Sequence, residues 1–125
     1  MATERESKSP RTANVHDRHG GWIGVDLDGT LAQYDHWRGI DHIGTPIPKM
    51  HSRVMQWLDE GKDVRIFTAR VANGPEAIGY IEAWCQYWLG RRLPVTNVKD
   101  MKMYELWDDR AVQVIKNAGV RVDGK

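Results

Sequence analysis

Short apolar runs alternate with amphipathic segments between residues 22 and 107, and this alternation limits the possible folds more than any other feature of the sequence. The runs at 22–25, 64–67, 94–98 and 104–107 have the length and composition of buried strands. Strands that alternate with helices usually pair in parallel and pack those helices against the sheet. We therefore expect an α/β fold, a three-layer Rossmann-like parallel sheet with flanking helices.

Two segments between these runs have the periodicity of helices. Between Pro48 and Gly61 the apolar residues recur at helical spacing, at Met50, Val54, Trp57 and Leu58. After Pro75 a second apolar stripe ends before Gly90 and contains Ile78, Ile81, Trp84, Cys85, Trp88 and Leu89. Proline suits the first helical turn and glycine suits the end of a helix. Residues 112–115 and 120–122 are expected to form a further edge element.

Length and composition indicate one globular domain. The chain has 125 residues, of which 41% are hydrophobic and 28% are charged, and its formal net charge is +1. Residues 1–20 contain little apolar surface, so we expect a mobile tail followed by a domain at 21–125. The sequence contains no apolar run long enough for a membrane span and no secretory signal. We expect a cytoplasmic protein with no membrane partner, and the oligomeric state stays open.

Polar side chains follow each of the four apolar runs. In chain order they are Asp26 and Asp28, Thr68 and Arg70, Lys99, and Asp108 and Asp109. The carboxyl ends of parallel strands line one crevice, which is the usual ligand site of such sheets. We therefore expect these side chains to converge.

The residue types at this edge favour a phosphate and a divalent cation. Carboxylates that lie close together repel one another unless a hard cation such as Mg²⁺ is bound. Gly29 permits a sharp turn, and its N–H can approach an oxyanion. Thr68 can donate a hydrogen bond to a phosphoryl oxygen, and Lys99 supplies a positive charge. Each signal has a plainer interpretation when taken alone, because Asp-x-Asp-Gly is also a common turn and Thr68 could simply cap a helix.

Two further residues have two interpretations each. Trp37, in the loop at 32–47, could stack against a substrate or anchor the loop. Arg70 could contact a second phosphate or the body of the substrate, or it could form a local ion pair. Both are candidate substrate-binding residues on the first interpretation.

With these residues assembled, the chain resembles the haloacid dehalogenase superfamily of phosphatases and phosphotransferases. The first motif matches the hydrophobic run and Asp-x-Asp-Gly-Thr at 25–31, and the second matches the Thr of 66–70. The third motif is a lysine, best matched by Lys99, with Lys102 as the competitor. The fourth is the acidic pair Asp108-Asp109. The resemblance covers about residues 22–114.

The resemblance implies a role for each matched residue. Asp26 would attack phosphorus and form an aspartyl-phosphate. Asp28 would act as the general acid and base, and its backbone carbonyl would bind Mg²⁺ together with a carboxylate oxygen of Asp26. Asp108 and Asp109 would complete the metal site, and which of them binds directly stays open. Thr68 and Lys99 would contact the phosphoryl group.

The intervals between the motifs leave no room for a cap domain. Members of the superfamily carry caps after the first motif or between the second and third, and both intervals are short here. An open crevice of this kind is associated with large substrates or with closure by another subunit. The resemblance implies a phosphorylated substrate, either a nucleotide or nucleic-acid 3′-phosphate end or a general small phosphoester.

Two other classes of protein could carry a similar set of residues. A signalling receiver domain uses similar residues, but it carries its acidic pair at the first strand, whereas Asp108-Asp109 comes last here. A non-enzymatic phosphate-binding or metal-binding module of the same fold would keep the site without turnover. All the side chains expected for catalysis are present, which favours the enzyme.

Overall fold

The computed structural model describes residues 20–125, so the predicted tail at 1–20 lies outside the described residues except for Gly20. The described chain forms β2 (Trp22–Val25), α2 (Pro48–Asp59), β3 (Asp63–Phe67), η1 (Ala69–Asn73), α3 (Pro75–Leu89), β4 (Val95–Thr96) and β5 (Met103–Trp107). The two helices and four strands occur where the sequence pattern predicts them. Each helix begins at its proline, and the run at 94–98 contributes only two residues to the sheet.

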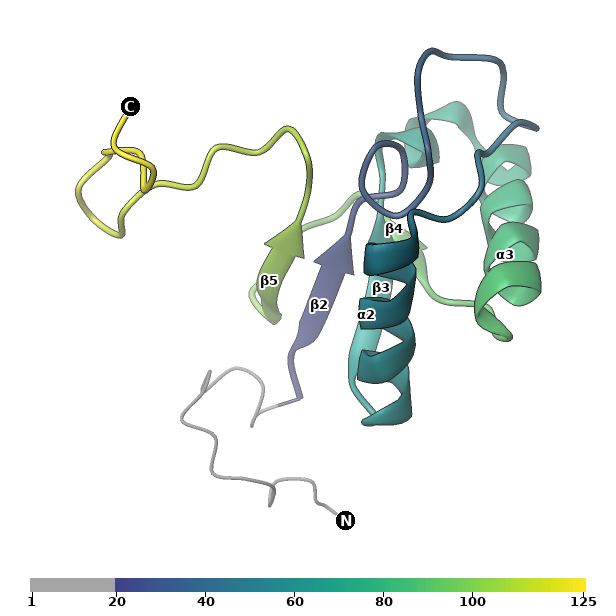
Figure 1. The fold of residues 1–125 in the computed structure, drawn as a ribbon, viewed down its shortest axis with the longest axis horizontal. Helices are drawn as coiled ribbons and strands as arrows, with labels where there is room; N and C mark the ends of the chain where they lie inside the picture. Colours follow the sequence, from purple (N-terminus) through teal and green to yellow (C-terminus); the bar gives the residue numbers. More distant parts are fainter. Residues whose placement is uncertain (1–19) are drawn as a thin grey trace.

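The four strands form one parallel sheet in the order β4-β3-β2-β5 (Figure 1). β2 lies between β3 and β5, and its Ile23 and Val25 pair with Val64 and Ile66 of β3. The end of β2 is therefore flanked by the ends of two other strands. This topology places the segment at 26–31 at the centre of the carboxyl edge of the sheet.

Both helices pack on the same face of the sheet. Ile23 and Val25 share one face of β2, and they belong to a single buried cluster with Val54 of α2 and Ile81 of α3. Right-handed crossovers from β2 to β3 and on to β4 require this arrangement, because both connections move in the same direction across the sheet. The expected α/β parallel sheet is confirmed. The third layer is not, because no helix covers the other face within residues 20–125.

The other face of the sheet is covered by side chains. Trp22 is buried on this face, with the guanidinium of Arg65 4.7 Å from its ring centroid and the Phe67 ring 6.5 Å away. Its Nε1–H donates to Asp100 Oδ1 at 2.8 Å. Because Trp22 begins β2, this bond fixes Asp100 at the amino edge of the sheet.

The C-terminal segment lies apart from the sheet (Figure 1). Ile115 N–H donates to the Val120 carbonyl at 2.7 Å, and Val114 forms an isolated bridge with Arg121. Residues 112–115 and 120–122 therefore pair with one another, and the prediction that they form an edge element of the domain is wrong. Local turn residues close this hairpin without help from the core. Among the described residues, no helix is long and apolar enough to cross a membrane.

Candidate active site at the carboxyl edge of the sheet

Three carboxylates converge at the end of β2 and β5. One carboxylate oxygen from each of Asp26, Asp108 and Asp109 lies within 4.8 Å of the others. The convergence follows from the sheet, since Asp26 N–H donates to the Trp107 carbonyl at 2.9 Å and continues the β2–β5 pairing. We call these three residues the acidic cluster.

Thr30 links the two sides of the acidic cluster. Its buried hydroxyl oxygen accepts from Asp109 N–H at 2.9 Å and lies 3.2 Å from Asp109 Oδ1 and 3.4 Å from Asp26 Oδ2. Thr30 was not predicted to be a site residue, although it belongs to the first motif. Its place within that motif was the available signal.

Repulsion and burial change the protonation of Asp26. Burial raises the pKa of the Asp26 carboxyl to about 7, and the negative charge of Asp108 and contacts with Asp109 act in the same direction. The carboxyl is thus costly to ionise in this setting. Like charges thus lie close to Asp26 in the acidic cluster.

The donor set of the acidic cluster fits a magnesium ion. Carboxylate oxygens are hard ligands of the kind that Mg²⁺ prefers, and a bound cation would offset the repulsion that raises the pKa of Asp26. Asp109 is exposed, which leaves one side open to the water molecules that Mg²⁺ retains. The residues present therefore fit the expected metal.

Gly29 serves the acidic cluster in a different way from the predicted one. Its N–H donates to the Ala32 carbonyl at 2.9 Å and is therefore engaged in a turn. The prediction that this N–H faces an oxyanion is wrong for this arrangement. The glycine is needed for another reason, because its φ is +87° and a Cβ there would lie 2.6 Å from Asp109 Oδ2. Glycine lets Asp109 approach the chain.

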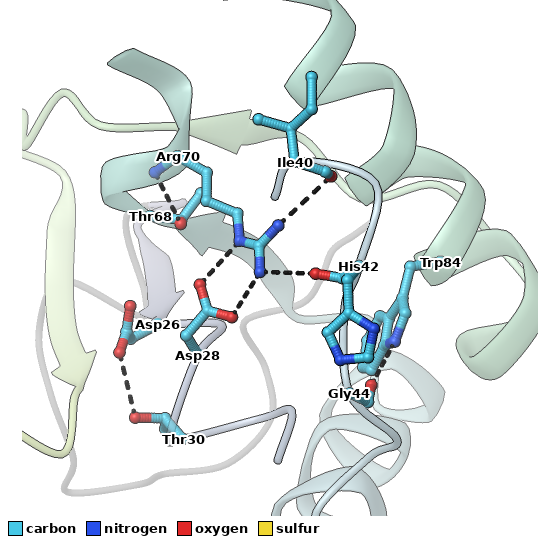
Figure 2. Close-up of polar contacts among 9 residues, drawn as sticks. All are labelled: Asp26, Asp28, Thr30, Ile40, His42, Gly44, Thr68, Arg70 and Trp84. Carbon is cyan, nitrogen blue, oxygen red and sulfur yellow. Dashed lines mark hydrogen bonds and ion pairs between the residues drawn. The ribbon is translucent and has the colours of Figure 1, made fainter. Parts of the chain in front are cut away.

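Asp28 points away from the acidic cluster and forms a two-bond ion pair with Arg70 (Figure 2). Arg70 Nε–H and Nη2–H donate to the two carboxylate oxygens, each at 2.8 Å. Nη2–H also donates to the His42 carbonyl at 2.9 Å, and Nη1–H donates to that of Ile40 at 3.4 Å. The Arg70 guanidinium also lies 4.8 Å from the ring centroid of Trp37. We call Asp28, Arg70 and Trp37 the arginine cluster.

This geometry supports the ion-pair interpretation of Arg70. The side chain is 5% exposed, and its guanidinium makes four hydrogen bonds within the protein. Little of its donor capacity is left for a substrate phosphate. Arg70 instead joins the loop at 33–45 to Asp28, and it covers one side of Trp37.

The arginine cluster and two members of the acidic cluster, Asp26 and Asp109, line one cavity of about 470 Å³, which we call the main cavity. Its lining residues come from the strand ends, from η1 and from the loop, and they are Asp26, Asp28, Tyr34, Trp37, Thr68, Ala69, Arg70, Asn73, Asp109 and Arg110. Thr68 is nearly fully buried, and its Oγ1 accepts from Arg70 N–H at 3.1 Å. Thr68 is therefore both an N-cap and a cavity residue, so the two interpretations of this residue are compatible.

Neither candidate lysine is among the residues that line the main cavity. Lys102 directly precedes β5, and its carbonyl accepts a hydrogen bond from Trp22 N–H at the amino edge of the sheet. Lys99 is exposed and directly precedes Asp100, which is fixed at that same edge. The chain from β4 to β5 has to return to the amino edge because the strands are parallel. The predicted convergence of Lys99 with the carboxylates is therefore not observed.

The main cavity contains three residues that were not predicted to belong to the site, Tyr34, Asn73 and Arg110. Asn73 ends η1, and no pattern in the sequence singled it out. Arg110 is the cation that adjoins Asp109 in the chain and also lines the cavity.

Comparison with known proteins supports the fold and goes no further. No protein-family model matches the chain, and no curated protein matches it. One solved structure, a conserved protein from Bacteroides thetaiotaomicron, superimposes with a TM-score of 0.58 at 21% identity. The match covers 74% of this chain and 78% of that one. This likeness shows that the α/β arrangement occurs in a solved protein.

Proposed function

We propose that this protein is a Mg²⁺-dependent phosphomonoester hydrolase of the haloacid dehalogenase type that works through an aspartyl-phosphate. The observation that carries the proposal is the acidic cluster at the carboxyl edge of a parallel sheet. Two of its members, Asp26 and Asp109, line one cavity with Asp28 and Thr68. Asp26 belongs to this cluster and also lines the cavity, as a nucleophile should.

The acidic cluster would hold the metal. Asp26, Asp108 and Asp109 are the proposed side-chain ligands, and the Asp28 carbonyl stays a predicted fourth. A bound Mg²⁺ would neutralise these carboxylates and the phosphate charge. Asp26 has to be ionised to attack phosphorus, and a cation would favour the ionised form.

The protein's residues divide the reaction into two steps. The first step begins with Asp26 ionised and Asp28 protonated. An oxygen of Asp26 forms a bond to phosphorus while the bond to the leaving ester oxygen breaks, and Asp28 gives its proton to this oxygen. Water then attacks phosphorus, Asp28 takes a proton from the water, and the bond from phosphorus to Asp26 breaks. Inorganic phosphate leaves, and both carboxylates return to their starting state. Thr68 would orient a phosphoryl oxygen through its hydroxyl.

The ion pair with Arg70 bears on the role of Asp28. Both of its oxygens accept hydrogen bonds from Arg70. Asp28 therefore has to loosen one of these two bonds to carry the proton that it gives in the first step and takes in the second. We expect both steps to be sensitive to changes at Arg70.

A phosphatase assay with a varied panel of esters tests the proposal. Wild-type protein is compared with Asp26→Asn on nucleotides, phosphorylated oligonucleotides, sugar phosphates and phosphopeptides, with Mg²⁺ or with chelator. We expect Mg²⁺-dependent phosphate release from at least one ester and a loss of at least about 1000-fold in Asp26→Asn. Asp59→Asn is the matched control, because Asp59 is an exposed carboxylate at the end of α2.

Two outcomes would overturn the proposal. Equal Mg²⁺-dependent activity in wild type and Asp26→Asn would remove Asp26 as the nucleophile. Binding of phosphoesters without turnover across the whole panel would favour the non-enzymatic module. Trapping phosphate on Asp26 after rapid acid quench, and finding none on Asp26→Asn, would support the covalent step directly.

A further inference from the structure

A second cavity adjoins the main one on the loop at 33–45, and Tyr34 lines both. This loop cavity measures about 350 Å³. Tyr34 is 48% exposed, so its ring is a free surface between the two spaces. A substrate with its phosphate at Asp26 could therefore extend past Tyr34 into the loop cavity. Any inference about that substrate depends on the proposed function.

Trp37 offers a second aromatic surface in the main cavity, and Arg70 packs against one side of its ring. The guanidinium of Arg70 covers one side of the ring at 4.8 Å, and Arg70 itself is buried. Trp37 is nevertheless 47% exposed, so its open surface is the side that does not face Arg70. Because Arg70 is fixed by Asp28 and by two loop carbonyls, Trp37 is positioned before any ligand binds. Positioned aromatic rings favour planar ligands.

The polar groups of the loop cavity carry no uncompensated positive charge that would call for a second phosphate. Arg38 donates to both oxygens of Asp35, at 3.2 and 2.9 Å, so the charges of these two side chains are paired with each other. Gln33, His42 and Thr45 supply side-chain donors and acceptors that are neutral when the histidine is neutral. This lining suits the polar edge of an uncharged heterocycle better than an acidic peptide or a polyphosphate.

We propose that the substrate is a phosphorylated nucleoside unit, with its base against Tyr34 and Trp37 and its phosphate at Asp26. The sugar of a nucleotide separates phosphorus from the planar base, which matches an aromatic surface beside the acidic cluster rather than within it. The tyrosine ring of a phosphopeptide is bonded directly to the ester oxygen and lacks that spacer. A free nucleotide and the phosphorylated end of a nucleic acid share this chemistry.

Kinetics on matched esters test the proposal. The substrates are a nucleoside monophosphate, an oligonucleotide with a terminal phosphate, glycerol phosphate and a phosphotyrosine peptide. The variants are Tyr34→Leu and Trp37→Leu, with Tyr87→Leu as the matched control because Tyr87 is 78% exposed on α3. The readout is the preference ratio, which is kcat/KM for the nucleotide substrate divided by kcat/KM for glycerol phosphate.

We expect the ratio to fall about tenfold in Tyr34→Leu and in Trp37→Leu, mainly through KM, because stacking on one aromatic ring contributes this order of affinity. Tyr87→Leu should leave the ratio unchanged. A larger ratio for the oligonucleotide would identify a nucleic-acid end, and a larger one for the monophosphate would identify a free nucleotide. An unchanged ratio in both aromatic variants, or a preference for the phosphotyrosine peptide, would overturn the proposal.

A binding measurement separates this proposal from the proposed function. Nucleotide affinity is measured by calorimetry on Asp26→Asn, with and without the Tyr34→Leu change. In one outcome the wild type hydrolyses no ester, while nucleotide binding still weakens about tenfold with Tyr34→Leu. In that case the proposed hydrolase activity is wrong, but the proposed binding of the base at Tyr34 is supported. If esters are hydrolysed at rates that do not depend on Tyr34 or Trp37, the proposed hydrolase activity is supported and the proposed binding of the base at these rings is wrong.

Discussion

Asp26 and Asp28 are two residues apart in the same motif, yet they lie in opposite electrostatic surroundings. Asp26 joins Asp108 and Asp109 in the acidic cluster, where burial and like charges raise the pKa of Asp26 to about 7. Asp28 faces Arg70, which satisfies both of its oxygens. The charges of the arginine cluster are paired within the protein. The acidic cluster instead gathers like charges, which is why we propose that it binds a cation.

The largest effect on stability is expected in the arginine cluster. Arg70→Ala leaves the Asp28 carboxylate without its partner and releases the loop, so we expect the free energy of unfolding to fall by about 3–5 kcal/mol. Urea denaturation measures this change. Arg121→Ala is the matched control, because Arg121 makes a two-bond pair with Asp123 on an exposed segment and should cost less than about 1 kcal/mol. Equal losses in the two variants would show that burial adds nothing to the Asp28–Arg70 pair.

Sequence patterns predicted the strand ends well, because those ends depend on local apolar runs. The run at 22–25 ends at Asp26 and the run at 104–107 ends at Asp108, so these acids come together once β2 and β5 pair side by side in a parallel sheet. The contact between Asp28 and Arg70 was harder to predict from the sequence. It joins residues 42 apart, and it depends on the directions in which the two side chains point after β2 and β3 end. A local pattern does not encode those directions.

Lys99 illustrates a second limit of the sequence. Its position depends on the path from β4 back to the amino edge, where Trp22 Nε1–H fixes Asp100. The residues between β4 and β5 show no periodic pattern, so the course of this segment cannot be predicted from the sequence. The one-sided packing of α2 and α3 was predictable in principle, because the handedness of the two crossovers determines it once the strand order is known. The strand order itself was not available from the sequence.

The acidic cluster should respond to Mg²⁺ with the next largest effect. At Mg²⁺ about 100-fold above its Kd, binding to the folded state should add about 2.7 kcal/mol to stability, and the Tm should rise. Asp109→Asn should remove most of this rise, because it deletes one ligand. Scanning calorimetry with Mg²⁺, compared with NaCl at the same ionic strength, measures the effect. A rise of equal size in Asp109→Asn would place the ion elsewhere.

Gly29→Ala sharpens the comparison, because it changes the approach of Asp109 without changing any charge. The left-handed φ should cost about 1–2 kcal/mol, and the new Cβ would displace Asp109 from the acidic cluster. Gly61→Ala is the matched control, since its φ is +81° and the space around its Cβ position is open. We expect similar backbone costs in the two variants, but a reduced Mg²⁺-induced Tm rise only in Gly29→Ala. An undiminished rise would mean that Asp109 tolerates the methyl group.

The smallest effect is expected at the base of the loop that the arginine cluster restrains. Trp84 Nε1–H donates to the Gly44 carbonyl at 2.8 Å (Figure 2), so Trp84→Phe should cost about 1 kcal/mol through the lost hydrogen bond. Trp88→Phe is the control, because Trp88 is more exposed on the same helix and its indole N–H makes no hydrogen bond within residues 20–125. Hydrogen exchange in the loop at 33–45 should accelerate in Trp84→Phe and more strongly in Arg70→Ala. If Trp84→Phe accelerated exchange as much as Arg70→Ala did, the hydrogen bond at Gly44 would restrain the loop as strongly as the bonds from Arg70 to Ile40 and His42, and the arginine cluster would not be its main restraint.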